Sequence, residues 1–580
     1  MSDIMTKRHS LSHVMAMAVL EKFPDAKMAI GPAIDTGFYY DFDNVQLSEA
    51  DLVQLERRMA QIIKTNPSFE HRMLGVDEAL TKEDDRDQIY KMELIDDLKA
   101  KGETELGYYK LGDFEDLCAG PHVDHLSEIK PGSFKLHKLA GAYWRGSEKN
   151  KMLTRIYGLA FDTKEELDAY LTMLSEAEKR DHKKLGKELD LFTFSDLVGS
   201  GLPLWTPKGT LMRNLLDDFV WELRRAYGYE KVEIPHITKK DLYETSGHWA
   251  KFKDELFRIT TREGHEFAMK PMNCPHHTQI YARKQWSYRE LPQRYANTTT
   301  CYRDEQTGEL AGLSRVRAFA QDDAHVFCRM AQTKEEFLKI WDVIHKFYPT
   351  FGFDLRVRLS IHDVASPEKY LGDQDNWKQA EDILRQIVTE KQVDWFEGVG
   401  EAAFYGPKLD FMAKDAIGRE WQVATIQLDM NMPERFDLFC INEKNEKERI
   451  VMIHAAIMGS IERFLSILIE HTAGVFPVWL SPVQVKLLAV GATHVEYCHQ
   501  LAQEFAEQKI RVEVDDSDET VGSKIRKATM EKVPYVLVIG DKEMESDKLN
   551  VRDRGDKETR EIAKEDFFWE VRGKIENRSN

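Results

Sequence analysis

The pattern of predicted strands and helices changes along this chain of 580 residues, and the changes separate it into domains. A single hydrophobic core rarely serves so long a chain, so about 150 residues per domain predicts three or four domains. No internal repeat or low-complexity tract interrupts them. The expected fold class is a multidomain α+β protein.

Four segments follow from these changes. Residues 1–160 mix strand-like runs such as 37–42 with helical stretches such as 50–64, and form an α+β domain. Residues 161–184 form a linker helix, because Thr163 and Glu166 can make a capping box ahead of apolar residues at helical spacing. Residues 185–478 combine strands and amphipathic helices without an evenly repeated βα pattern. Residues 479–580 alternate buried strands (485–490, 512–514, 535–539) with helices, as in a small α/β domain.

The N-terminal segment and the cysteines indicate an intracellular protein. Polar residues including His9 and His13 interrupt the first apolar run, so it does not resemble a secretory leader. Other apolar runs are far shorter than the ~20 residues that span a bilayer. The six cysteines are scattered without CxxC pairs, which is typical of reduced thiols. We expect a cytoplasmic enzyme with no membrane segment.

The net charge of −19 argues against nucleic-acid binding, because neutralising phosphates requires Lys and Arg. Net charge is an average over the whole chain, however, and basic clusters occur at 144–151, 179–184 and 524–527. Each cluster by itself is more typical of a solvated surface. Charge alone therefore leaves nucleic-acid binding open.

Two histidine-containing pairs stand out in the first domain. If 10–20 is helical, His9 and His13 lie on one helix face, as a paired ligand or catalytic site requires. Cys118 and His122 form a second pair in CAGPH. One such pair is common in cores and on surfaces, but two in one small domain indicate a site. These groups can hold zinc, or can position a water for hydrolysis.

Charged and aromatic residues surround a loop in the central domain. Arg303 and Glu305 precede the loop, and Arg315 and Phe319 follow it. Such groups can bind an α-phosphate, an adenine amino group and an adenine ring, although an edge hairpin with alternating charges has the same spacing. Arg463, near the start of an amphipathic stretch, suits a terminal phosphate because its planar fork pairs two oxygens.

With these motifs the chain resembles class II aminoacyl-tRNA synthetases. Arg303-x-Glu305 with Phe319 resembles motif 2, 459–463 (GSIER) resembles motif 3, and Pro235 resembles the motif 1 proline, in family order. Within the class, threonyl-tRNA synthetases are similar in 272–275 (MNCP), 321–325 (QDDAH), 404–408 (FYGPK), 421–422 (WQ), 452–454 (MIH) and both histidine pairs. The resemblance implies an antiparallel-sheet catalytic core in 185–478, an editing domain in 1–160 and an anticodon-binding domain in 479–580.

The resemblance also implies an amino-acid site built around one zinc ion per chain. Its ligands would be Cys274, His325 and His454, which no spacing rule connects. Three protein ligands leave room on the metal for the amino group and hydroxyl of L-threonine. Valine lacks the hydroxyl, a loss of the kind that gives ~10⁴-fold or greater discrimination. The other threonine contacts implied are Gln321, Asp323, Tyr405, Gln427 and Lys408.

ATP is expected to bind with Mg²⁺ in the same domain. The implied contacts are Arg303 at the α-phosphate, Arg315 and Arg463 at the outer phosphates, Glu305 and Phe319 at adenine, and Gln422 at the ribose. Arg303, Arg463 and His248 are the implied catalytic residues, His248 in the transfer to tRNA(Thr). Positioning and charge stabilisation supply the catalysis.

Serine keeps the hydroxyl and lacks one methyl group, a difference of roughly 1–3 kcal/mol that is too small for accurate translation. The resemblance therefore implies that the first domain hydrolyses seryl-tRNA(Thr), with no required metal. The implied editing residues are His9, His13, Cys118 and His122, assisted by Asp116 and Lys91.

Further implications concern RNA binding and assembly. Unstacked anticodon bases can be recognised through their pairing edges, and Arg526, Glu543 and Arg552 are expected to contact them. Motif 1 usually forms a dimer interface, so a homodimer is expected. Because the chain starts at the editing motif, the small ubiquitin-like domain that many relatives carry in front is not expected.

Four residues depart from the family pattern, and two alternative functions stay open. The departures are His276 for Gly, Tyr302 for His, Ala455 for Arg and Asp518 for an amide. One alternative is a class II synthetase for serine or proline, which the Cys-His-His set disfavours. The other is a tRNA-binding regulatory paralogue that does not charge tRNA, which intact Arg303, Glu305 and Arg463 disfavour.

Overall fold

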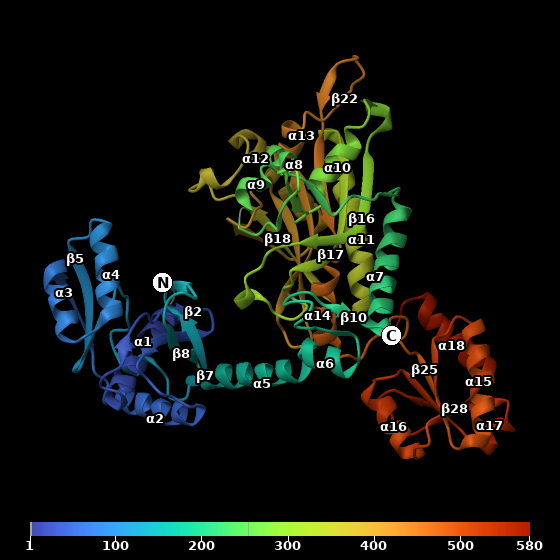
Figure 1. Ribbon diagram of the computed structural model, residues 1–580, viewed down its shortest axis with the longest axis horizontal. Coiled ribbons are helices and arrows are strands. Elements are labelled where there is room, and N and C mark those ends of the chain that lie inside the picture. The colour runs from blue at the N-terminus through green and yellow to red at the C-terminus, as the bar shows by residue number, and fades with distance from the viewer. Residues whose placement is uncertain (1–2, 253, 580) are drawn as a thin grey trace. The chain divides into compact units, whose positions relative to one another are not determined.

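The computed structural model describes residues 3–252 and 254–579. The chain divides into two compact units, Met1–Ser175 and Glu176–Asn580 (Figure 1). Among the helices of the described residues, none has both the length and the apolar character that a bilayer span requires.

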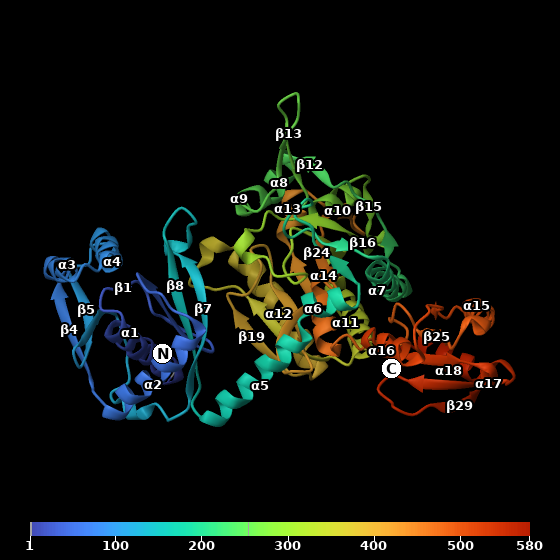
Figure 2. The same cartoon turned by 60° about the horizontal axis from the view of Figure 1, so that its bottom comes forward.

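The N-terminal unit is built on a helix packed against an antiparallel sheet. Helix α1 (Asp3–Lys22) buries Leu11, Val14 and Met15 at helical spacing. The sheet has the order β1 (Lys27–Met28), β3 (Gly37–Asp43), β8 (Met152–Ala160) and β7 (Phe134–Tyr143), with β2 (Ala33–Ile34) beside β3. Figure 2 shows β7 and β8 as a long hairpin, and α2 (Glu49–Thr65) joins the same core.

A second, smaller sheet completes this unit. Strands β4 (Phe69–Gly75), β5 (Glu105–Leu111) and β6 (Phe114–Leu117) pair in sequence order. Helices α3 (Val76–Asp85) and α4 (Ile89–Ala100) lie between β4 and β5 in the chain. Cys118 directly follows β6, and Lys91 lies on α4.

The helix predicted over 161–184 is in fact two helices. The capping box is present, because the Glu166 amide donates to Thr163 Oγ1 (3.2 Å) at the start of α5 (Lys164–Arg180). A second helix, α6 (His182–Glu188), begins after Asp181, whose side chain accepts from the Lys183 amide (2.7 Å). An aspartate that caps a new helix interrupts the preceding one.

The second unit contains the antiparallel sheet expected of the class II core. Its eight strands have the order β11 (Glu230–Lys231), β16 (Gln293–Tyr302), β17 (Ala318–Cys328), β24 (Val451–Ala456), β21 (Glu420–Asp429), β20 (Lys408–Lys414), β18 (Asp354–Ile361) and β19 (Trp395–Val399). Only the outermost pairs, β11 with β16 and β18 with β19, are parallel. The fold class is confirmed.

One face of this sheet is covered by helices and the other is left for the site. Helices α7 (Pro207–Ala226), α11 (Thr333–Phe347), α12 (Gln374–Lys391) and α14 (Ile461–Thr472) supply the core, and Figure 1 shows α7 and α11 side by side. On β17, Ala320, Ala324 and Val326 point into that core. Side chains alternate along a strand, so Gln321, Asp323 and His325 share the opposite face.

Smaller elements flank the sheet. The three-stranded sheet of β12 (Ile237–Lys239), β14 (Glu266–Met269) and β13 (Arg258–Thr260) accompanies α8 (Lys240–Ser246), α9 (His248–Lys251) and α10 (Cys274–Tyr281). Strands β15 (Trp286–Ser287), β22 (Phe439–Ile441) and β23 (Lys447–Arg449) form another, with α13 (Asn431–Arg435) just before β22 in the chain. Strands β9 (Phe192–Thr193) and β10 (Leu204–Trp205) pair ahead of α7.

The C-terminal segment has the expected α/β organisation. Its sheet has the order β26 (Val512–Asp515), β25 (Val485–Ala489), β27 (Tyr535–Ile539), β28 (Lys548–Asp553) and β29 (Arg560–Ala563). Its helices are α15 (Ala492–Glu507), α16 (Val521–Met530), α17 (Asp541–Met544) and α18 (Lys564–Glu576). The sequence did not predict β28 and β29, which carry many charged residues and only a few buried apolar ones.

Candidate active site

Strand register brings the three predicted zinc ligands together. His325 of β17 lies directly opposite His454 of β24, and Cys274 is the first residue of α10. The three candidate ligand atoms lie within 4.8 Å of one another, and all three residues are buried. Residues 51 and 180 positions from Cys274 along the chain thus meet at one point.

Two further residues hold the imidazoles in place. His454 Nε2 lies 2.9 Å from Asp429 Oδ2, and His325 Nδ1 lies 2.7 Å from His277 Nδ1. His325 Nε2 is buried and has no hydrogen-bond partner among the described residues. Histidine ligands usually bond their other nitrogen to a carboxylate, a backbone carbonyl or water, as His454 does to Asp429, so the donor set and the orphaned nitrogen fit a zinc ion.

The sequence did not identify His277 or Asp429. His277 lies only three residues after Cys274, and the sequence directed attention to its neighbour His276 instead. Both ring nitrogens of His276 lack a hydrogen-bond partner among the described residues. Asp429 has no sequence signal, because only the pairing of β21 with β24 brings it to His454.

Asp323 is held by a buried polar network. Its carboxylate accepts from Asn273 Nδ2 (3.2 Å), and Asn273 Oδ1 accepts from Lys270 Nζ (2.8 Å). Burial raises the pKa of Asp323 to about 6, and it lowers the pKa of Lys270. A carboxyl group fixed beside the ligands can accept a hydrogen bond from a small polar substrate.

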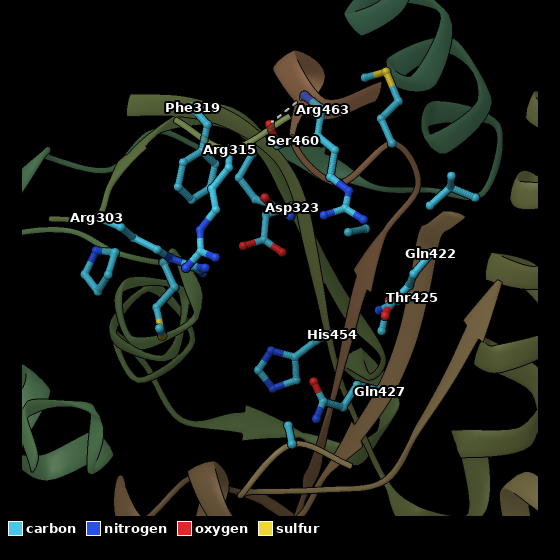
Figure 3. Close-up of a pocket in the computed structure, with 18 of the residues that line it drawn as sticks. Arg303, Arg315, Phe319, Asp323, Gln422, Thr425, Gln427, His454, Ser460 and Arg463 are labelled. Atoms are coloured by element: carbon cyan, nitrogen blue, oxygen red, sulfur yellow. Dashed lines mark hydrogen bonds between the residues drawn. The ribbon is translucent and has the colours of Figure 1, made fainter. Parts of the chain in front are cut away.

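The predicted nucleotide-binding residues line the same cavity, which has a volume of about 960 Å³. Arg303 lies 5.2 Å from the Phe319 ring centroid, and Arg315 Nε donates to Glu305 Oε2 (2.8 Å). In Figure 3 the side chains of Arg303 and Arg315 reach into the cavity from the hairpin, and that of Arg463 reaches in from α14. Gln321, Tyr405, Gln422 and Gln427 also line it.

Two predicted residues are not among the described residues that line the cavity. Lys408 is in register with Gln427, but its Nζ pairs with the buried carboxylate of Asp410. His248 is fully buried, with Nδ1 2.8 Å from Ser246 Oγ, and its ring contacts Phe404, which lines the cavity.

The N-terminal unit brings the four predicted editing residues into one cluster. Cys118 Sγ lies 3.3 Å from His9 Nε2 and 3.4 Å from His122 Nε2. The rings of His13 and His122 are 4.4 Å apart. The helix expected at 10–20 is α1, and it places His9 and His13 on one face as predicted.

Asp116 and Lys91 form a buried pair beside this cluster. Lys91 Nζ lies 2.6 Å from Asp116 Oδ1, and His13 Nε2 lies 4.0 Å from Asp116 Oδ2. The Tyr40 hydroxyl donates to Asp116 and accepts from Lys91 Nζ (3.0 Å). Pairing and hydrogen bonding allow both charges to stay buried.

Burial keeps the cluster uncharged near neutral pH. It lowers the pKa of His9, His13 and His122, and it raises the pKa of the Cys118 thiol to about 11. Neutral imidazoles can accept protons, and a neutral thiol can donate a weak hydrogen bond. The cluster can therefore orient a water molecule next to a polar substrate.

The three predicted anticodon residues lie on different elements. Arg526 is exposed on α16, Glu543 lies on α17 and Arg552 on β28. Glu543 accepts from Asn550 Nδ2 (2.9 Å). Among the described residues no hydrogen bond or ion pair joins the three predicted side chains to one another.

Three segments of the chain match known protein families. Residues 257–472 match the family described as tRNA synthetase class II core domain (G, H, P, S and T), residues 484–574 match Anticodon binding domain, and residues 107–157 match Threonyl and Alanyl tRNA synthetase second additional domain. A threonine–tRNA ligase of Porphyromonas gingivalis is 49% identical over 94% of this chain and 84% of its own. The chain belongs to the threonine–tRNA ligase family.

Other members of the threonine–tRNA ligase family extend the likeness to nearly the full chain. The ligase of Acetivibrio thermocellus is 48% identical over 99% of this chain and 89% of its own. The solved RNA binding domain of threonyl-tRNA synthetase from Cryptosporidium parvum is 36% identical, with a TM-score of 0.65, over 68% of this chain and 98% of its own. The family resemblance predicted from the sequence is confirmed.

We predict that acid destabilises the N-terminal unit through its histidine cluster. The folded state depresses the pKa of these histidines below the unfolded value of about 6.5, so the unfolded chain binds more protons below that pH. Stability is then lost as pH falls through 6.5, by up to ~1.4 kcal/mol per pH unit for each histidine. Thermal melting of the full chain at several pH values measures this slope.

A His122→Gln variant provides the comparison, because it removes one titrating group from the cluster. Its melting temperature should depend less steeply on pH than that of the unchanged chain. Equal slopes would show that His122 is not held neutral by the fold.

Proposed function

We propose that this chain activates L-threonine with ATP in the central cavity, transfers it to tRNA(Thr), and hydrolyses seryl-tRNA(Thr) at the N-terminal cluster. One observation carries the synthetic part. The Cys-His-His set and the arginines of motifs 2 and 3 line the same cavity. An enzyme that joins an amino-acid carboxylate to an α-phosphate must hold both groups in one place.

Cys274, His325 and His454 would hold a zinc ion, because thiolate and imidazole are ligands that zinc prefers and three protein ligands leave the metal accessible to substrate. Bound there, zinc would supply a Lewis acid for the amino group and hydroxyl of threonine, and valine lacks that hydroxyl. The protein orients the site through Asp429 and His277. Asp323, held by Asn273, is proposed to accept a hydrogen bond from the threonine hydroxyl.

The arginines supply the electrostatic part of activation. We assign Arg303 to the α-phosphate, and Arg315 and Arg463 to the outer phosphates of ATP bound with Mg²⁺. Positive groups fixed around the phosphates stabilise the charge that develops as the threonine carboxylate attacks and pyrophosphate leaves. Phe319 and Glu305, on the same hairpin, are proposed to hold the adenine ring and its amino group.

The remaining cavity residues are assigned by position. Gln321, Tyr405 and Gln427 are proposed to contact threonine, and Gln422 the ribose of ATP, because all four line the cavity. Lys408 is proposed to support this wall through Asp410 rather than to touch threonine. Burial lowers the pKa of His248 to about 3, so a neutral imidazole is available to assist transfer to the terminal ribose.

Editing is assigned to the histidine cluster of the N-terminal unit. A site that selects threonine by its hydroxyl admits serine, so a second, hydrolytic site is required for accuracy. The uncharged His9, His13, Cys118 and His122 are proposed to orient a water against the seryl ester without a required metal. The match of residues 107–157 to the threonyl and alanyl additional domain supports this assignment.

We propose functional ranges of 1–160 for editing, 161–184 for the link, 185–478 for synthesis and 479–580 for the anticodon, with the reaction in the cytoplasm. The match of residues 484–574 to the anticodon-binding family supports the last range. Arg526, Glu543 and Arg552 are proposed to contact anticodon bases.

We propose that the chain forms a homodimer through an exposed apolar segment, residues 194–198, which lies between α6 and α7 in the chain. Leu197 is 100% exposed, Val198 44% and Phe194 40%, within one short segment of the described residues. Clustered exposed apolar side chains commonly mark an interface. The segment precedes α7 and Pro235, the predicted motif 1 proline, in the chain, which supports pairing with a second copy of the chain.

We predict that Cys274→Ala removes both the zinc and threonine-dependent ATP–pyrophosphate exchange. Loss of a ligand should cost at least as much as loss of a supporting residue, which is roughly 10–100-fold in metal affinity or activity. Metal analysis and isotope exchange measure the two effects. Cys328→Ala is the control. Its thiol is also buried but lies on β17, and this variant should keep both the zinc and the exchange activity.

Two outcomes would contradict this proposal. Full exchange by zinc-free protein would exclude the zinc role. Zero exchange by zinc-loaded protein, with tRNA binding intact, would favour the non-charging regulatory alternative.

We predict that Cys118→Ala and His9→Ala slow hydrolysis of seryl-tRNA(Thr) by at least ~100-fold, as expected when a group that positions or activates water is lost. Threonine-dependent exchange should be unchanged. His125→Ala, an exposed histidine on the same loop, serves as control. Normal deacylation by either cluster variant would refute the editing assignment.

We predict that the purified chain sediments as a dimer, and that Leu197→Asp shifts it toward monomer because a charge is costly to bury at an interface. Val399→Asp, at a valine that is 62% exposed on β19, should have no such effect. Sedimentation of the unchanged chain only as monomer would exclude this interface.

A further inference from the structure

The loop between β16 and β17 carries two of the groups that face the nucleotide side of the cavity. Glu305 lies near its start and Arg315 near its end, and they pair across it at 2.8 Å. Its own turn is held by the Ala311 amide donating to the Arg315 carbonyl (3.1 Å). Contacts from outside the loop hold its two ends, because the Asp304 amide donates to the Glu255 carbonyl (2.9 Å) and the Arg317 amide donates to the Gly201 carbonyl (2.7 Å).

Between these ends, the loop is contacted by His182, the first residue of α6. The Leu313 amide donates to His182 Nε2 (3.0 Å), and both residues are buried. Gly312, at φ +55°, approaches so closely that a Cβ there would lie 2.3 Å from His182 Nε2. The loop therefore packs directly against the His182 imidazole.

The other nitrogen of His182 reaches α14. His182 Nδ1 lies 2.6 Å from Glu470 Oε1, and the His182 amide donates to the same oxygen (3.2 Å). The second oxygen of Glu470 accepts from Arg419 (2.7 Å). Because the Leu313 amide can only donate, Nε2 accepts and Nδ1 carries the proton that Glu470 accepts. Both nitrogens are thus engaged, which argues against a metal at the Asp181, His182 and Glu470 group.

Helix α14 also carries Arg463, about two helical turns before Glu470. His182 therefore bridges the loop that carries Arg315 and the helix that carries Arg463. We propose that His182 is a positioning residue, which sets the spacing of Arg315 and Arg463 so that both hold the outer phosphates of ATP. This inference rests on the phosphate roles proposed for the two arginines.

A pair of substitutions separates the two contacts of the ring. In His182→Asn the amide nitrogen can still donate to Glu470, but no atom reaches the Leu313 amide. In His182→Gln the longer side chain can offer an oxygen at the position of Nε2. Leaving a buried donor unpaired is costly, so His182→Asn should raise the KM for ATP by at least ~5-fold. The KM for threonine and the zinc content should be unchanged, and His182→Gln should lie within about twofold of the original enzyme.

Arg180→Ala is the matched control, because Arg180 donates to the His471 carbonyl (3.1 Å) at the same junction without touching the loop. It should leave the KM for ATP unchanged. If His182→Asn does not fold, Gly312→Ala tests the same contact from the loop side and should also raise the KM for ATP.

The inference is overturned if His182→Asn keeps the original KM for ATP. It is also overturned if the Asn and Gln variants raise the KM for ATP and for threonine alike, since that pattern indicates general destabilisation. An Arg315→Ala variant distinguishes failure of the proposed phosphate role from failure of the positioning role of His182. An unchanged KM for ATP in Arg315→Ala refutes the phosphate role itself, whereas a raised value beside a normal His182→Asn refutes only the role of His182.

Discussion

The antiparallel register of β17 with β24 and of β24 with β21 is the constraint on which the central cavity depends. It sets His325 opposite His454, and His454 opposite Gln427, across three neighbouring strands. Because side chains alternate along β17, Asp323 joins His325 on the cavity face while Ala324 enters the core. A shift of one residue would exchange these faces and bury the polar set in the core.

Two buried carboxylates of this domain, Asp322 and Asp429, are paired on opposite faces of the sheet. Asp322, on the core face of β17, pairs with Arg224 and accepts from the amides of Ile457 and Met458. That contact fixes the chain just ahead of motif 3. On the cavity face, Asp429 orients His454 in the same manner. Leaving any of these groups unpaired would carry a large desolvation cost, so together they hold the cavity in one arrangement.

Burial has a different effect on the side chains of each of the two proposed sites. In the central cavity, burial surrounds a ligand set and a carboxyl group that fit a cation and a polar substrate. In the N-terminal unit, burial keeps His13, His122 and Cys118 uncharged, which suits the handling of water. The chemistry of threonine connects them, because a site that recognises a hydroxyl cannot exclude serine and a separate hydrolytic site corrects the error.

The sequence by itself determined the family and the α+β organisation, because motifs such as the two histidine pairs and the motif 2 hairpin are short and contiguous. Through the family resemblance it also predicted most residues of both candidate sites. It also predicted α1, α2 and the buried strands of the C-terminal segment from apolar spacing. Only the tertiary structure decided which groups support these residues. His277, Asp429 and His182 meet their partners through strand pairing and helix packing across long stretches of chain, and no local pattern encodes such contacts. The same reason explains the break at Asp181, where a cap for α6 ended a helix that spacing alone had predicted to continue.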